Sequence, residues 1–99
     1  MSDQSNEIVV VYDKDFLKDT RKLSADVQDK LALHIKILRG HPFDSRLHTK
    51  PLDAPLQGMF SFRIRRGYRA GFKFESSHVI RLLAVDRRDK IYKRLKRKI

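Results

Sequence analysis

The sequence contains no cysteine and no long apolar run. Without thiols the chain can form neither disulfides nor thiolate metal sites, so redox chemistry does not identify its compartment. No apolar stretch approaches the roughly 20 residues of a membrane span, and the polar residues 1–6 lack the basic and apolar segments of a signal peptide. We therefore expect a cytoplasmic protein that makes no membrane contact.

Several catalytic motifs are also missing. The four histidines lack the His-x-x-x-His spacing of a zinc site, and the basic half of the chain has no paired carboxylates for magnesium binding or two-carboxylate hydrolysis. There is no glycine-rich phosphate loop and no nucleophilic serine motif. The sequence thus predicts no metal and no small-molecule cofactor. His48 and His78, at predicted loop or strand ends, remain as side chains that could touch a substrate.

What the chain has in excess is positive charge, and this charge is unevenly distributed. The net charge is +11. Residues 1–40 carry 7 Lys+Arg and 7 Asp+Glu, whereas residues 41–99 carry 16 Lys+Arg and 5 Asp+Glu. A neutral scaffold with one basic surface favours a phosphate-rich partner, nucleic acid before membrane. An acidic protein partner is the alternative.

The length of 99 residues leaves room for one domain. Such a domain buries roughly 60–65% of its unfolded surface. We expect it to span residues 7–99, after a disordered tail at residues 1–6 that has no apolar residue after Met1 to hold it.

Apolar and polar residues alternate over residues 60–65 and again over residues 68–75. This period of two predicts two half-buried strands joined near Gly67. If both apolar sets face one core, residue 64 pairs with 70, or 65 with 69, across a loop of odd length. A two-residue loop would turn Arg69 into the core, where a lone guanidinium is costly. The odd loop places four cations on one face: Arg63, Arg65, Arg69 and Lys73.

A third strand is predicted at residues 79–85, which are apolar on both sides except at Arg81. It runs into a charged segment that would deliver Arg87, Arg88 and Tyr92 to the end of the sheet near the cationic face. In most proteins a basic strand face is only a solvated surface. The clustering of cations here favours a functional site instead.

The remaining segments predict an α+β fold. Residues 8–12 are β-branched and indicate a first strand; Asp13 can cap a helix through Leu23, and Ser24 can start a second helix that ends at Gly40. The predicted inner residues are Phe16, Leu17, Thr20 and Leu23 of the first helix and Val27, Leu31, Ile35 and Leu38 of the second. We expect an N-terminal strand and a two-helix hairpin packed on a roughly four-stranded, mainly antiparallel twisted sheet.

Two further segments complete the chain. Residues 41–58 contain all three prolines and are expected to cross an edge of the sheet irregularly. The end of the chain predicts a short basic helix with Ile91, Leu95 and Ile99 on one side, which is marginal unless it docks.

A cation-lined sheet face can act on RNA without a metal. Cleavage by the 2′-hydroxyl requires an in-line nucleotide, stabilisation of the phosphorane charge and proton transfer. Arginines supply the charge. Because arginine is a poor acid or base, Lys73, Tyr92 or a histidine is left for the proton transfer.

Residues 56–72 read LQGMFSFRIRRGYRAGF and residues 82–92 read LLAVDRRDKIY, after the predicted strand and helix pair. In this order the two segments resemble the RelE/ParE superfamily of bacterial toxin–antitoxin pairs, and the likeness covers residues 8 to about 95. The RelE branch implies a type II toxin that acts as an mRNA interferase, a ribosome-dependent, metal-independent endoribonuclease. It also implies that a cognate antitoxin neutralises the toxin.

The same resemblance implies the catalytic residues, which are Arg63, Arg69, Arg88 and Tyr92. From the basic surface we add a predicted RNA-binding set, which is Arg65, Lys73, Arg87, Lys50 and Arg81. The chain departs from the family at Ser61, where RelE-type toxins can carry a lysine, and at Asp86-Arg87-Arg88, where Gly-His-Arg or Gly-Lys-Arg is frequent. A ParE-like gyrase inhibitor, or a nucleic-acid-binding protein that does not cleave, is the alternative; the Arg88 and Tyr92 pair favours RNA.

The expected partners are the ribosome, mRNA and an antitoxin with an acidic, amphipathic segment. We expect the C-terminal helix to dock near the cationic face of the free protein, where an antitoxin could displace it or cover the same surface. The alternative is a permanently solvated helix, with the antitoxin bound elsewhere.

Overall fold

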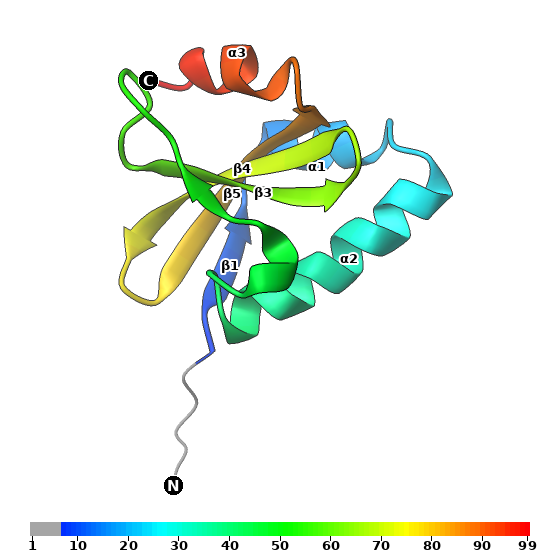
Figure 1. The fold of residues 1–99 in the computed structure, drawn as a ribbon, viewed down its shortest axis with the longest axis horizontal. Helices are drawn as coiled ribbons and strands as arrows, with labels where there is room; N and C mark the ends of the chain where they lie inside the picture. Colours follow the sequence, from blue (N-terminus) through cyan, green and yellow to red (C-terminus); the bar gives the residue numbers. More distant parts are fainter. Residues whose placement is uncertain (1–6) are drawn as a thin grey trace, which may run out of the picture.

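The computed structural model describes residues 7–99, so the predicted tail at residues 1–6 lies outside the described residues. Within this range no helix is both long and apolar enough to span a bilayer. In chain order (Figure 1) the elements are β1 (Val9–Tyr12), α1 (Lys14–Thr20), α2 (Ala25–Gly40), the 3-10 turn η1 (Ser45–Leu47), β2 (Lys50–Pro51), β3 (Met59–Arg65), β4 (Tyr68–Ser76), β5 (Val79–Arg87) and α3 (Ile91–Lys96).

The strands form one mixed sheet in the order β1-β5-β4-β3-β2. β1 runs parallel to β5, and the other neighbours are antiparallel. The predicted α+β architecture is confirmed, with β5 inside the sheet as expected. The sheet has five strands because Lys50 and Pro51, within the segment predicted to be irregular, pair with Ser61 and Phe60 of β3.

The sheet is covered on both faces. α2 packs over the face that carries the larger core, in which Phe62, Phe72 and Leu82 are fully buried. α3 packs over the opposite face on a smaller core, formed by Leu52, Leu56, Met59, Leu83, Ala84, Ile91 and Leu95. The separation follows from the pleat, since Met59 and Phe60 are neighbours in β3 and belong to opposite cores.

The second helix agrees with its prediction and the first one differs. The Ser24 hydroxyl caps α2 by accepting from the Val27 N–H at 3.4 Å. α1 ends at Thr20, three residues before the predicted end, and Leu17 is 44% exposed. The buried residues of α1 are Phe16 and Asp19, because α1 lies beside β5 beyond the end of β1. The pairing of β1 with β5 ends at Leu82, and beyond it the Asp19 carboxylate accepts a hydrogen bond from the Val85 N–H at 3.0 Å.

The hairpin between β3 and β4 corrects the predicted loop. Arg65 pairs with Tyr68 across a two-residue turn. A bulge at Ile64 then shifts the register by one residue, so that Arg63 pairs with Arg69 and the two apolar sets face the same core. Gly67 in the turn has φ +90°, a conformation that glycine adopts without a steric cost. The bulge turns Arg65 toward α2, where it forms an ion pair with Asp26. The prediction that Arg65 shares a face with Arg63 is therefore wrong.

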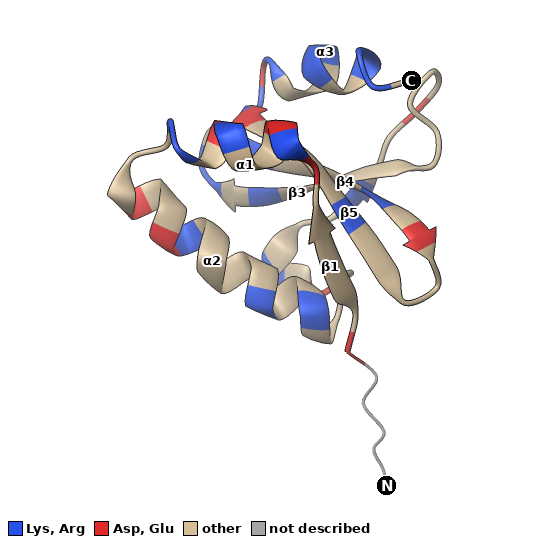
Figure 2. Ribbon diagram, turned by 180° about the vertical axis from the view of Figure 1, so that it is seen from behind, with Lys and Arg blue, Asp and Glu red and all other residues tan. Residues whose placement is uncertain are grey.

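α3 is docked on the sheet through two of the three predicted residues. Ile91 and Leu95 are fully buried, whereas Ile99 is 68% exposed. Leu95 lies directly on β4, because a Cβ added to Gly71 would stand 2.6 Å from its Cδ2. Figure 2 shows that the docked helix is strongly basic and that α1, close to it, carries acidic residues.

Candidate functional site

Arg63 and Arg69 lie directly opposite each other on β3 and β4. Cross-strand partners project to the same face of a sheet, so both arginines lie on the α3 side, opposite the buried Phe62 and Phe72. This confirms the shared face predicted from the alternation. Arg63 is exposed, whereas Arg69 is half-buried.

Neutral oxygen atoms hold Arg69 in place. Its Nε donates to the Ser61 hydroxyl at 2.9 Å, and its Nη2 donates to the carbonyl oxygens of Ser61 at 3.1 Å and His48 at 2.9 Å. Burial lowers the pKa of Arg69, the nearby Tyr92 raises it and Arg63 lowers it. Arginine stays protonated at physiological pH, so these contacts orient the guanidinium without cancelling its charge.

His48 joins this group from the loop before β2. It has a left-handed backbone with φ 48°, and its Nε2 lies 2.8 Å from Nη2 of Arg63. Since a guanidinium can only donate, the histidine nitrogen accepts this hydrogen bond. The sequence marked His48 as a residue that could touch a substrate, and the structure places it beside the two arginines.

Arg88 reaches the same place from the end of β5. Its backbone N–H donates to the Gly67 carbonyl at 2.8 Å, which ties the end of β5 to the β3–β4 turn. A hollow of about 460 Å³ is lined by Arg63, Arg66, Gly67, Tyr68, Arg69 and Arg88. Three of the four predicted catalytic residues thus line one cavity.

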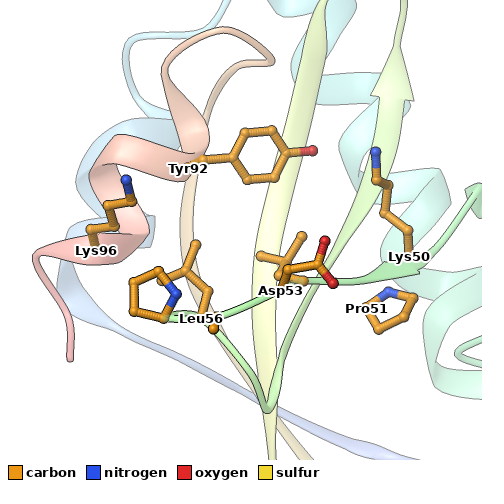
Figure 3. A pocket seen from close by; sticks show the side chains of 9 residues that line it. Lys50, Pro51, Asp53, Leu56, Tyr92 and Lys96 are labelled. Atoms are coloured by element: carbon orange, nitrogen blue, oxygen red, sulfur yellow. The ribbon is translucent and has the colours of Figure 1, made fainter.

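Tyr92, the fourth residue, lies in the first turn of α3 and lines a different hollow of about 310 Å³, together with Lys50, Asp53 and Lys96. Its ring projects across this hollow with the hydroxyl directed toward the side of Lys50 (Figure 3). Tyr92 is also close enough to raise the pKa of Arg69. Tyr92 therefore does not line the hollow of the three arginines, but it lies within electrostatic reach of Arg69.

No protein-family model and no curated protein matches the chain in sequence. Solved structures do match it: a chain of the toxin–antitoxin complex RelBE2 from Mycobacterium tuberculosis is 26% identical with a TM-score of 0.71, over 88% of this chain and 98% of that chain. The YoeB/ParE toxin from Agrobacterium tumefaciens is 18% identical with a TM-score of 0.71, over 81% of this chain and 98% of that chain. A chain of the archaeal RelE–RelB complex from Pyrococcus horikoshii is 18% identical with a TM-score of 0.70, over 83% of this chain and 96% of that chain.

This chain has the RelE/ParE fold. The resemblance seen in two short segments is confirmed at the level of the fold, and the matched structures are toxins or toxin–antitoxin complexes.

Within the RelE/ParE fold, the other predicted RNA-binding residues fall into separate places. Lys73 pairs with Met59 and so shares the face of Arg69, and Arg87 is exposed at the end of β5. The Arg81 charge is compensated, because its Nε lies 2.8 Å from a Glu75 oxygen. Arg65 is paired on the α2 side.

The described residues offer no metal site. Within residues 7–99, no three side chains of His, Asp or Glu lie together in a geometry that could hold a metal ion.

Proposed function

We propose that this chain is the toxin of a type II toxin–antitoxin pair and that it cleaves mRNA on the ribosome. The observation that carries the proposal is the convergence of Arg63, Arg69 and Arg88 on one hollow next to His48. With Arg66, four arginines line this hollow. Their positive charge complements that of a phosphodiester, which becomes more negative at its equatorial oxygens as a nucleophile attacks.

In the proposed reaction the 2′-oxygen forms a bond to phosphorus and the bond from phosphorus to the 5′-oxygen breaks. The products are a 2′,3′-cyclic phosphate and a 5′-hydroxyl. The arginines stabilise the phosphorane, and the fixed orientation of Arg69 by Ser61 and His48 avoids reorganisation during the reaction.

His48 is our candidate for taking the proton of the 2′-hydroxyl. Its Nε2 accepts from Arg63 in the free protein. When Arg63 turns to a phosphate oxygen, this nitrogen becomes free to act as a base. Tyr92 and Lys73 remain the candidates for returning a proton to the 5′-oxygen.

The deciding experiment is in vitro translation of a defined message, followed by primer extension. We expect new cDNA ends only when translating ribosomes and the protein are both present, and we expect them to form about a hundredfold more slowly with Arg69→Gln. Inhibition of translation without new ends would favour a non-cleaving nucleic-acid-binding protein. Inhibition of DNA supercoiling by gyrase, with translation intact, would favour the ParE-like alternative.

We further propose that an acidic, amphipathic antitoxin segment covers α3 and the arginines beneath it. Deleting residues 93–99 would remove the buried Leu95 as well as surface charge, so a sharper variant is Lys93→Gln/Lys96→Gln/Arg97→Gln, which changes exposed side chains only. We expect antitoxin affinity to fall more than tenfold, or about 1.4 kcal/mol. Unchanged affinity would show that the antitoxin binds elsewhere.

A further inference from the structure

Asp86 stands next to the arginines of the hollow. It is the cross-strand partner of Arg69 on β5, and the Cβ atoms of such partners lie about 4.5–5.5 Å apart on one face. A carboxylate in that position would ordinarily pair with the guanidinium and compete with any phosphate. Asp86 is also one of the positions at which this chain departs from the pattern of RelE-type toxins.

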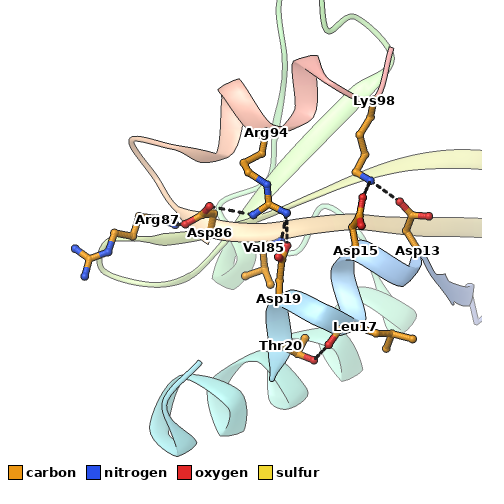
Figure 4. Close-up of polar contacts among 10 residues, drawn as sticks. All are labelled: Asp13, Asp15, Leu17, Asp19, Thr20, Val85, Asp86, Arg87, Arg94 and Lys98. Atoms are coloured by element: carbon orange, nitrogen blue, oxygen red, sulfur yellow. Dashed lines mark hydrogen bonds and ion pairs between the residues drawn. The ribbon is translucent and has the colours of Figure 1, made fainter. Parts of the chain in front are cut away.

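The structure shows both side chains engaged elsewhere. Arg69 points away from Asp86, and its partners are Ser61 of β3 and the carbonyl of His48 in the loop before β2. One Asp86 oxygen accepts the Arg87 N–H at 2.7 Å, and the other accepts from Nη1 of Arg94 at 3.0 Å. The acid is thus satisfied from the α3 side (Figure 4).

Arg94 is itself fixed from a second direction. Its Nη2 donates to both oxygens of Asp19 at 2.9 Å, and Asp19 is held by the Val85 N–H. The Arg94 and Asp86 side chains are only 27% and 26% exposed, and that of Asp19 10%. Burial lowers the pKa of Arg94, but the hydrogen bonds that Arg94 donates to Asp19 and Asp86 outweigh this effect, so that the pKa is raised. Two carboxylates therefore share one guanidinium next to the candidate site.

We propose that Arg94 is a positioning residue that holds the Asp86 carboxylate away from Arg69 and so keeps the Arg69 charge free for phosphate. Arg94 does not line the hollow of Arg63, Arg69 and Arg88. Without Arg94, the Asp86 carboxylate turns to its cross-strand neighbour, and the cavity loses one usable cation. The inference rests on the proposed function only in taking an RNA phosphate as the ligand.

A double-mutant cycle tests this assignment, with a short fluorescein-labelled single-stranded RNA as the probe and anisotropy as the readout. Arg94→Gln is expected to weaken binding about tenfold, the value of one charge-assisted hydrogen bond. Asp86→Asn alone is expected to change affinity less than about twofold, because its charge is already engaged. The double variant is expected to return to within about threefold of the parent protein.

The matched control is Arg97→Gln, which removes the same charge from the C-cap of the same helix at an exposed position. It is expected to leave affinity within about twofold. If Arg94→Gln behaves like this control, or if the double variant stays as weak as Arg94→Gln, the positioning role is wrong. Melting curves of all four variants separate loss of folding from loss of charge.

A second readout requires no RNA. The Arg69 Nε–Hε resonance reports its hydrogen-bond partner directly, and it should shift in Arg94→Gln and return in the double variant. An unmoved resonance in Arg94→Gln would overturn the inference. If the parent protein fails to bind RNA, the proposed function fails, and the resonance still decides whether Arg94 keeps Asp86 from Arg69.

Discussion

The two faces of the sheet use arginines in different ways. On the α2 face, Arg65 is neutralised by Asp26 at the rim of a large aromatic core. On the α3 face, Arg63 donates to a His48 nitrogen, and Arg69 donates to the Ser61 hydroxyl and to two carbonyl oxygens, so that no carboxylate pairs with either arginine in these contacts. Arg63 and Arg65 stand only two residues apart, and one bulge separates them. On this sheet, local partners thus decide whether an arginine keeps an uncompensated charge.

The first way to break this comparison is to remove one large residue from each core. Phe62→Ala, beneath α2, is expected to cost about 3–5 kcal/mol of global stability. Leu95→Ala, beneath α3, is expected to loosen that helix locally. Hydrogen exchange would show lost protection in α3 with the sheet still protected. Equal loss of protection throughout would mean that the two cores unfold as one unit.

The second comparison sets Arg69 against Arg65. Arg69→Gln is expected to lower the rate of message cleavage about a hundredfold, as loss of one preorganised donor does. Arg65→Gln removes the same charge from the opposite face and is expected to leave the rate within about twofold, since a surface ion pair contributes little. Primer extension over a time course gives both rates. Equal losses would mean that overall charge, and not the face, determines activity.

The salt dependence of RNA binding sharpens the same distinction. For single strands the log–log slope is about −0.7 per phosphate neutralised. We expect a steep slope for the parent protein, a slope smaller by about 0.7 for Arg63→Gln, and no change for Arg65→Gln. Anisotropy titrations at several salt concentrations measure this slope for each protein. A flat response in the parent protein would rule out a phosphate-dominated interface.

The smallest expected effect concerns His34 of α2, whose Nδ1 donates to the Arg63 carbonyl at 2.8 Å. Burial lowers the pKa of His34 from 6.5, although the hydrogen bond to Arg63 opposes the shift. The unfolded chain therefore takes up the proton first, and stability is lost as the pH falls below 6.5 toward the folded pKa. His34→Gln keeps a donor, so its denaturation midpoint should fall less between about pH 7 and about pH 5. Parallel curves would assign the pH dependence to other groups.

Much of the fold could be predicted because its residues follow regular periods. The alternation over residues 60–75 gave β3 and β4, and the stripe of α2 gave its buried side. The bulge could not be predicted, since Ile64 fits the alternation and no local residue marks the extra position. β2 has only two residues, too few to show any period. The length of α1 depends on Asp19 reaching a free strand N–H, which is a tertiary contact.

Some residues of the candidate site could likewise be predicted from the sequence, and others could not. The convergence of Arg63, Arg69 and Arg88 followed from strand parity and from the family resemblance. The supporting residues did not, because the positions of Ser61 and the His48 carbonyl depend on the sheet register and on a left-handed loop residue. The role of Arg94 was hidden for the same reason, since its two partners lie 8 and 75 residues away.

The contact of Gly71 with Leu95 has a consequence for how this chain can change over time. A methyl group at position 71 would collide with both terminal methyl groups of Leu95, at 2.6 and 2.7 Å. Since Leu95 is fully buried, it has little room to move aside. The volumes at these two positions are therefore expected to vary in opposite directions among descendants of this sequence. A Gly71→Ala change should persist only after, or together with, a smaller residue at position 95.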